Sequence, residues 1–307
     1  MVLQIIHTCL PDKKILALLR CSMKIAETVK DLSEKLSRAR EGGCSIGFVP
    51  TMGALHSGHI SLVERAKREN TLVLCSIFVN PAQFNDPADL EKYPRTPAAD
   101  IEMLERAECD ILFMPPVSEI YPQGEVQGEY DFGYLENIME GRFRKGHFKG
   151  VGRVVARLFR ICGPVTAYFG EKDFQQLAVI RMLVEKYHLP ARIVGCPVIR
   201  ENDGLAMSSR NVLLSAAERK DAVLVSRALF AAQEKAAGLT ISEVKKLVHG
   251  ILKSSPLIRP EYFEIVDGDT LLPLAQWEDA AFIRACIAVK IGHVRLIDNV
   301  PLNVPPA

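Results

Sequence analysis

The sequence has almost no excess of either charge, since its 307 residues contain 38 Lys and Arg against 37 Asp and Glu. A net charge of +1 provides no bulk attraction to nucleic acid or to an anionic membrane surface. The chain also lacks an apolar run near the ~18 residues that span a bilayer, and it has no internal repeat or low-complexity tract. Its 48% hydrophobic and 24% charged residues are typical of a soluble globular protein with one large domain or two ordinary ones.

The eight cysteines include no C-x-x-C pair, and several of them lie inside apolar runs. Cysteine in such surroundings behaves as a small hydrophobic residue. This usage argues against a disulfide framework or structural zinc, and it predicts a reducing, cytoplasmic location. The positions are Cys9, Cys21, Cys44, Cys75, Cys109, Cys162, Cys196 and Cys286.

Residues 1–22 are mixed apolar and basic, without a clean apolar segment that ends in a small-residue cleavage site. Met23 opens a more ordinary start, which reads as a helix closed by Gly42 and Gly43. We therefore expect 1–22 to be a peripheral extension or an upstream start. A targeting peptide is the alternative.

From Met23 to Ile199, apolar runs that suit buried strands alternate with amphipathic stretches that suit helices. This alternation predicts an α/β fold with a Rossmann-like, mainly parallel sheet covered on both faces, over 23–199. The expected strands are 44–49, 71–79, 109–114, 165–170 and 191–199, and the expected helices are 23–41, 59–70, 97–107, 150–162 and 174–188. The Gly- and Pro-punctuated stretch 116–149 reads as irregular.

After Ile199 the pattern changes to Ala-rich helices at 216–237 and 241–254, followed by short alternating strands from 260 to 300. These strands read as an antiparallel sheet. We therefore expect 200–307 to form a smaller C-terminal α+β domain.

The stretch 48–70 combines a strand, a Gly-bearing loop and a helix, which is how α/β folds build phosphate sites. Gly53 and Gly58 allow close approach of a ligand, and Ser57 is the expected N-cap. His56 and His59 lie three residues apart, so at ~100° per residue their rings are about 60° apart around the helix axis. Both rings are therefore expected to face one phosphate chain.

Four polar, turn-forming clusters follow predicted strands. They are PTMGALHSGH (50–59), NPAQFN (80–85), GEKDFQQ (170–176) and RENDGLAMSSRN (200–211). Since ligands gather beyond the carboxyl ends of strands in an open parallel sheet, the clusters are expected to line one cleft.

Each cluster also has a simpler explanation. The histidines suit an exposed loop, Lys172 and Asp173 an ordinary helix start, and Ser208 to Arg210 a turn. Asn80 and Gln83 could bind a hydroxyl or carboxylate, or cap a loop. The basic and aromatic residues of 142–149 resemble an RNA-binding patch, but the near-zero net charge argues against nucleic acid.

Taken together, PTMGALHSGH, SIFVNPAQF, GEKDFQQL and DGLAMSSRN resemble the pantothenate synthetase (pantoate–β-alanine ligase) family, from about Met23 to Asn299. This family belongs to the nucleotidyltransferase superfamily that carries the HxGH signature. The resemblance implies a dimeric cytosolic enzyme that condenses pantoate with β-alanine using ATP, through a pantoyl adenylate. It implies small-molecule substrates, and neither nucleic acid nor membrane as a partner.

The resemblance also implies residue roles. His59 would be the catalytic proton donor, assisted by His56, Lys172, Ser208, Ser209 and Arg210. Gln83 and Gln176 would hold pantoate, with Asn80 nearby, and Tyr93, Glu140 and Arg144 match the family's pantoate gate. The ATP site would comprise Met52, Gly53, Ala54, Leu55, His56, Ser57, Gly58, His59, Gly170, Glu171, Lys172, Asp173, Ile199, Met207, Ser208, Ser209 and Arg210.

Adenylation moves negative charge onto departing pyrophosphate, so we expect His59, Lys172 and Arg210 to act as cations where that charge develops. Mg²⁺ is implied because it screens the triphosphate, and we assign it no protein ligands. A nucleotidyltransferase for a phosphorylated acceptor would need further basic residues, whereas neutral Asn80, Gln83 and Gln176 suit a hydroxy acid. A non-catalytic nucleotide-binding module would not need the three cations together.

Overall fold

The structure is a computed structural model that describes residues 22–123 and 128–304. The extension expected at 1–22 lies outside the described residues except for Ser22. None of the helices that the structure describes is long and apolar enough to cross a membrane.

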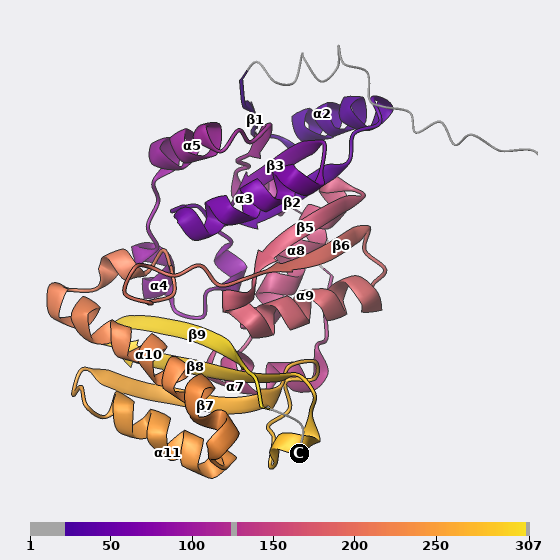
Figure 1. The fold of residues 1–307 in the computed structure, drawn as a ribbon. Coiled ribbons are helices and arrows are strands. Elements are labelled where there is room, and N and C mark those ends of the chain that lie inside the picture. The colour runs from indigo at the N-terminus through magenta and orange to yellow at the C-terminus, as the bar shows by residue number, and fades with distance from the viewer. Residues whose placement is uncertain (1–21, 124–127, 305–307) are drawn as a thin grey trace, which may run out of the picture.

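Six parallel strands form the main sheet, in the order β1-β4-β3-β2-β5-β6 (Figure 1). Every neighbouring pair is parallel, as the β-α alternation predicts. The strands are β1 (Lys24–Ala26), β2 (Ile46–Thr51), β3 (Leu72–Ile77), β4 (Ile111–Phe113), β5 (Val165–Gly170) and β6 (Ala191–Cys196).

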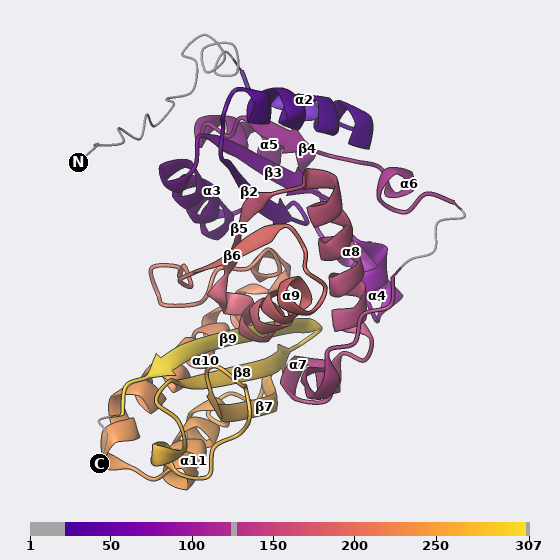
Figure 2. The same cartoon turned by 90° about the vertical axis from the view of Figure 1, so that its right-hand side faces the viewer.

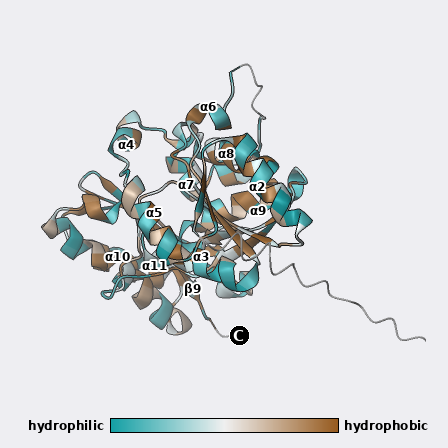
Figure 3. Cartoon of the chain, turned by 90° about the horizontal axis from the view of Figure 1, so that it is seen from above, coloured by the Kyte–Doolittle hydropathy of each residue, from teal (hydrophilic) through white to brown (hydrophobic). Residues whose placement is uncertain are grey.

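The sheet is buried on both faces because alternate strand residues pack against helices on opposite sides. Phe48 and Leu74 belong to the core cluster that contains residues of α2, α8 and α9, whereas Val49 and Val73 pack with residues of α3 and α5. Figure 3 shows the apolar strands enclosed by helices with polar outer faces. These helices are α2 (Val29–Glu41), α3 (Ser57–Glu69), α5 (Pro97–Arg106), α8 (His147–Cys162) and α9 (Phe174–Lys186).

The strand order reverses at β2. From β2 the chain proceeds outward through β3 to β4, and it then crosses back to β5 on the other side of β2. Such a switch point leaves a crevice at the carboxyl ends of the two diverging strands. The loops after β2 and β5 therefore meet there.

The expected helix 23–41 is wrong in its first residues. Lys24–Ala26 is instead the edge strand β1, paired with β4, and α2 begins only at Val29. Thr28 is the N-cap, and its side-chain oxygen accepts a hydrogen bond from the Asp31 amide. A strand of three residues is too short to show a period of two, so its tertiary pairing decided its structure.

The stretch expected to be irregular, 116–149, contains two short helices, α6 (Val117–Ile120) and α7 (Met139–Phe143). A further short helix, α4 (Pro87–Lys92), lies in the polar loop after β3. Helices of four to six residues present too few positions for a helical period to appear in the sequence.

The C-terminal part forms an antiparallel sheet, β7-β8-β9, as the alternating pattern predicts. Two helices pack on it through a separate core cluster (Figure 1). The strands are β7 (Ile258–Asp267), β8 (Ile283–Ile291) and β9 (Val294–Leu302), and the helices are α10 (Ala216–Lys235) and α11 (Ile241–Leu252). Figure 2 shows α7 and α9 beside this sheet, so it adjoins elements that lead to the crevice.

Candidate active site

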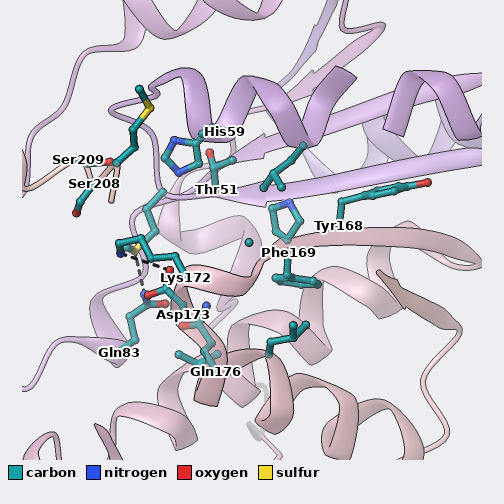
Figure 4. Close-up of a pocket in the computed structure, with 18 of the residues that line it drawn as sticks. Thr51, His59, Gln83, Tyr168, Phe169, Lys172, Asp173, Gln176, Ser208 and Ser209 are labelled. Atoms are coloured by element: carbon teal, nitrogen blue, oxygen red, sulfur yellow. Dashed lines mark hydrogen bonds and ion pairs between the residues drawn. The ribbon is translucent and has the colours of Figure 1, made fainter. Parts of the chain in front are cut away.

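One cavity opens at the carboxyl ends of β2 and β5, and residues of all four predicted clusters line it. In Figure 4, His59 and Thr51 lie on one side of the cavity, and Gln83, Asp173 and Gln176 lie on the other. The predicted residues on its lining are Met52, His56, Gly58, His59, Gln83, Gly170, Lys172, Asp173, Gln176, Ile199, Met207, Ser208, Ser209 and Arg210. Gly53, Ala54, Leu55, Ser57, Asn80 and Glu171 are not on the lining.

The start of α3 differs from the expectation, because His56 is the N-cap and Ser57 is the first residue of the helix. The His56 side chain accepts a hydrogen bond from the Gly58 amide, 3.1 Å away. The His59 side chain accepts one from the His56 amide, at 3.3 Å. The two imidazoles thus make the reciprocal capping pattern usually made by Ser or Thr with Glu.

This cap fixes the tautomer of both rings. Backbone N–H groups can only donate, so Nδ1 of His56 and Nδ1 of His59 must both be acceptors. In the neutral rings the proton is therefore on Nε2. Nε2 of neither ring has a hydrogen-bond partner within the described residues, so each ring keeps an N–H donor for a ligand at the cavity.

Burial keeps both rings neutral in the free protein. Burial, followed by the Lys172 charge, lowers the pKa of His56 to about 4. Burial, then His56, then Lys172 lower the pKa of His59 to about 3. The expectation that His59 acts as a cation therefore does not hold for the ligand-free protein, where it is a neutral donor. Lys172, which was itself expected to act as a cation, contributes to the lowered pKa of both rings.

The loop amides expected to cradle phosphates are largely occupied by the protein itself. The Asp100 carboxylate on α5 accepts hydrogen bonds from the Ala54 amide at 2.9 Å and the Leu55 amide at 2.8 Å. Its Oδ1 also accepts one from the Thr96 hydroxyl at 3.0 Å. Asp100 is only 2% exposed, so these two amides are already paired with a buried carboxylate.

The same contact holds a strained turn. Gly53 and Ala54 both have positive φ, +78° and +49°, which is costly for alanine. The two bonds from Asp100 compensate for this cost and fix the path of the chain into α3. Asp100 was missed in the sequence because a carboxylate in the first turn of a helix is ordinary there.

The Ser-Ser-Arg segment closes over this loop. The Ser209 hydroxyl donates to the Ala54 carbonyl at 2.8 Å, which joins residues 155 positions apart. Arg210 pairs with the Asp89 carboxylate of α4 at 2.9 Å, and its guanidinium lies 5.3 Å from the centre of the Tyr93 ring. In the free protein Arg210 is therefore engaged by a carboxylate.

Lys172 lies on the short turn between β5 and α9 and lines the cavity, with Asp173 as its salt-bridge partner at 3.7 Å. Glu171 points elsewhere, since its carboxylate binds Arg284 of β8 at 2.7 Å. Asn299 of β9 donates to the Glu171 carbonyl at 2.8 Å and to the Lys172 carbonyl at 3.0 Å. The C-terminal sheet thus holds the backbone that carries Lys172.

The three predicted amides differ in their surroundings. Gln83 is buried on the lining, where its Nε2 lies 2.9 Å from Met52 Sδ and its Oε1 accepts from Asn80 Nδ2 at 3.1 Å. Gln176 lines the cavity and has no hydrogen-bond partner within the described residues. Asn80 is buried behind Gln83, where it also donates to the Gly150 carbonyl at 3.1 Å and accepts from the Tyr121 hydroxyl at 2.8 Å. Asn80 therefore supports Gln83 from behind.

The basic and aromatic segment 142–149 is not a continuous surface patch. His147 and Phe148 are buried, and Arg144 is mostly so. Arg144, His147 and Tyr93 line the cavity, whereas Glu140 is buried behind it. The composition of the segment did not indicate that these residues are buried, because their burial comes from the packing of α8 under the loop after β3.

Within residues 22–123 and 128–304, no group of three or more His, Cys, Asp or Glu side chains is placed to hold a metal ion. Asp173 is the one carboxylate among the described residues that line the cavity.

Comparisons with known proteins agree with this geometry. The pantoate-beta-alanine ligase family matches residues 24–301. The chain is 50% identical over 278 residues to a pantothenate synthetase of Bacteroides thetaiotaomicron, covering 91% of this chain and 98% of the relative. It is 49% identical over 278 residues to a pantothenate synthetase of Porphyromonas gingivalis, covering 91% and 99%.

Two solved structures share the fold. The pantothenate synthetase of Thermus thermophilus has a TM-score of 0.86 and 45% identity, covering 92% of this chain and all of that one. The pantoate-beta-alanine ligase of Francisella tularensis, complexed with beta-gamma ATP and beta-alanine, has a TM-score of 0.75 and 36% identity, covering 93% and 100%. The parallel sheet, the histidine pair after its central strand and these matches over nine-tenths of the chain show that the protein belongs to the pantoate–β-alanine ligase family.

Proposed function

We propose that this protein condenses pantoate with β-alanine at the expense of ATP, giving pantothenate, AMP and pyrophosphate through a pantoyl adenylate. The observation that carries the proposal is the convergence of four polar clusters on one cavity at the switch point of the sheet. Family membership and the ligands of the Francisella relative support it.

In the first step, a pantoate carboxylate oxygen attacks the α-phosphorus of ATP and the bond to pyrophosphate breaks. Negative charge grows on the departing oxygen, where donors and cations lower the barrier. We assign His56 and His59 as N–H donors through Nε2, and Lys172 as the cation. Their Nδ1 contacts with the backbone are made before ligand arrives, so the donors are preorganised.

In the second step, the amine of β-alanine attacks the acyl carbon of the adenylate, loses a proton and expels AMP. No protein nucleophile is required, so the protein's task is positioning and exclusion of water. Gln83 and Gln176 are neutral amides that suit the hydroxyls and carboxylate of pantoate. Asn80 contributes by holding the Gln83 amide.

For ATP, we propose that Arg210 leaves Asp89 and pairs with the phosphate chain, because a triphosphate carries more charge than one carboxylate. Met52, Gly58, Gly170, Ile199 and Met207 line the remaining cavity wall and are assigned to the nucleotide. Ser208 and Ser209 are assigned to keeping this loop against the histidines.

Mg²⁺ would enter with ATP as part of the substrate, since it prefers phosphate oxygens and retains several waters. Asp173 is the carboxylate at the cavity that fits a contact through such a water. The assignment of the metal to the nucleotide requires no cluster of protein ligands.

We also propose, from the resemblance, a cytoplasmic homodimer in which 23–199 binds nucleotide and pantoate and 200–307 acts as a lid. Six described cysteines, all buried and unpaired, are consistent with a reducing compartment. The separate C-terminal core cluster supports a boundary near 200.

Exchange of radiolabelled pyrophosphate into ATP tests the proposal, and we expect it to depend on added pantoate and to need no β-alanine. Exchange without pantoate, or only with a phosphorylated acceptor, would favour a nucleotidyltransferase. ATP binding without any exchange would favour a non-catalytic nucleotide-binding module. Either result would contradict the ligase assignment.

Replacement of Gln83 with alanine is expected to raise the KM for pantoate by about 10- to 100-fold, because a hydrogen bond to a charged ligand is lost. The KM for ATP should change by less than about threefold, since the two ligands use different walls. Gln233→Ala, in α10, removes an amide that contacts the Pro301 carbonyl instead of the cavity, and serves as the control. Equal losses for both substrates would be inconsistent with the assigned role.

A further inference from the structure

His147 lines the cavity, yet the reaction described above gives it no task. It is the first residue of α8 and only 4% exposed. Buried histidines are unusual unless their ring nitrogens have partners. Here both nitrogens do, and the partners belong to Gln83 and Arg144, which line the same cavity.

The two contacts require one particular tautomer. His147 Nδ1 lies 2.9 Å from the Gln83 carbonyl oxygen, which can only accept, so Nδ1 carries the proton. Nε2 lies 3.0 Å from Arg144 Nη1, which can only donate, so Nε2 must present its lone pair. Burial, followed by the Arg144 charge, lowers the pKa of His147 to about 3, which agrees with a neutral ring.

The Gln83 side of this contact is rigid because α8 packs directly under the turn after β3. A Cβ added to Gly150 would lie 2.1 Å from the Ala82 carbonyl oxygen, so only glycine permits the approach. Asn80 Nδ2 also donates to the Gly150 carbonyl at 3.1 Å. The first turn of α8 and the backbone of Gln83 therefore keep a fixed separation.

The Arg144 side is held by the C-terminal sheet. Arg144 Nη1 lies 3.8 Å from the Glu140 carboxylate, which is itself buried. Arg295 of β9 donates to both Glu140 oxygens, at 2.6 and 2.7 Å, and the Tyr262 hydroxyl of β7 donates at 2.8 Å. Arg144 thus lies between a fixed carboxylate and the lone pair of His147.

We propose that His147 is a positioning residue. It holds the Gln83 backbone through Nδ1–H and the Arg144 guanidinium through Nε2, and so fixes the side of the cavity that is assigned to pantoate. The inference rests on the proposed function for the identity of the substrate. His147 acts through its two neighbours and takes no part in the chemical steps.

Three variants separate the two contacts. Asparagine places an amide at the same bond distance from Cα as Nδ1, so His147→Asn can keep the Gln83 contact and loses the acceptor for Arg144. Glutamine places its amide at the distance of Nε2, so His147→Gln can keep the Arg144 contact and loses the donor to Gln83. His147→Ala loses both. His249→Asn, at an exposed position in α11, is the control.

In the pyrophosphate-exchange assay, we expect His147→Ala to raise the KM for pantoate about 10-fold or more. His147→Asn and His147→Gln should raise it by less, because each keeps one contact. The KM for ATP should stay within about threefold of the parent value in all three variants. In an Arg144→Ala background, His147→Asn should add no further loss, because its effect passes through Arg144. His147→Gln should still raise the KM for pantoate there, because its effect passes through Gln83.

The inference is overturned if the parent is active and His147→Ala has the same KM for pantoate. It is also overturned if the KM for pantoate, the KM for ATP and the melting temperature all change together in His147→Ala, because a purely structural residue would give that result. Imidazole ¹⁵N chemical shifts of the full-length protein supply a readout that needs no activity. An Nδ1–H tautomer at neutral pH supports the proposal, and an Nε2–H tautomer or an imidazolium overturns it. If the parent protein shows no pantoate-dependent exchange, the proposed function is overturned instead. The ¹⁵N chemical shifts would then still test whether His147 has the tautomer that its two contacts require.

Discussion

Replacing His59 with alanine is expected to slow pantoate-dependent pyrophosphate exchange by about 10²- to 10⁴-fold, the range for losing a general acid or an oxyanion-type donor. The ring presents Nε2–H to the cavity because the His56 amide occupies Nδ1. The donor is therefore already oriented before ATP binds, and alanine offers no substitute. The measurement is kcat for exchange at saturating ATP and pantoate.

The capping role of His59 must be separated from its role as donor. His59→Asn places an amide oxygen at the same bond distance from Cα as Nδ1, so it can still accept from the His56 amide but has no Nε2–H. We expect it to lose as much activity as His59→Ala while keeping the parent's melting temperature. Near-parent turnover in either variant would remove His59 from the mechanism.

The pH dependence gives an independent check on the charge of these histidines. Because burial lowers the pKa of His59 to about 3 and of His56 to about 4, both remain neutral in the free enzyme at neutral pH. The profile of kcat/KM for ATP reports ionisations of the free enzyme and of free ATP, so it should show no step near the ordinary histidine pKa of about 6.5 beyond the one that ATP itself contributes. A step there that disappears in His59→Asn would contradict the neutral ring.

Replacing Lys172 with methionine is expected to reduce kcat for adenylate formation by about 10²- to 10³-fold. Lys172 lines the cavity and its partner Asp173 lies 3.7 Å away, whereas Arg210 is engaged more closely by Asp89 at 2.9 Å. Lys172 is therefore the cation more readily available where charge develops on pyrophosphate. Methionine keeps the length of the apolar stem and removes only the charge. Single-turnover formation of the adenylate measures the effect.

The matched control is Lys186→Met, in the last turn of α9, where the ammonium pairs with Asp131 on the surface. It should retain parent activity, since surface ion pairs contribute little. If Lys172→Met lowered only the affinity for ATP and left kcat unchanged, Lys172 would bind the ground state and transition state equally and would have no specific role in the barrier.

The sequence predicted the parallel sheet well because the signal is local. Apolar runs such as Leu72–Ile77 and the amphipathic stretch of α3 are encoded by neighbouring residues. The same reasoning failed for Lys24–Ala26, whose strand conformation comes from pairing with β4 across the fold. It also misassigned the N-cap of α3, since histidine is not among the residues usually favoured there.

Within the site, the sequence identified which clusters meet, but it did not predict what their atoms do. The loop amides were expected to hold phosphates, and two of them instead bind Asp100, which is 45 and 46 residues away. Asn80 was expected near pantoate and lies behind Gln83. A hydrogen bond between residues far apart has no local periodicity, so no pattern in the sequence announces it.

The residues by themselves determined the alternation of the longer strands and helices, the four polar clusters at the strand ends and the family to which the chain belongs, because periodicity and motif spacing are properties of neighbouring positions. Only the tertiary structure decided the protonation of His59, the occupation of the loop by Asp100 and the placement of His147 between Gln83 and Arg144. The physical reason is that pKa values and buried hydrogen bonds depend on which groups lie next to one another away from water. Packing brings those groups together from distant parts of the chain.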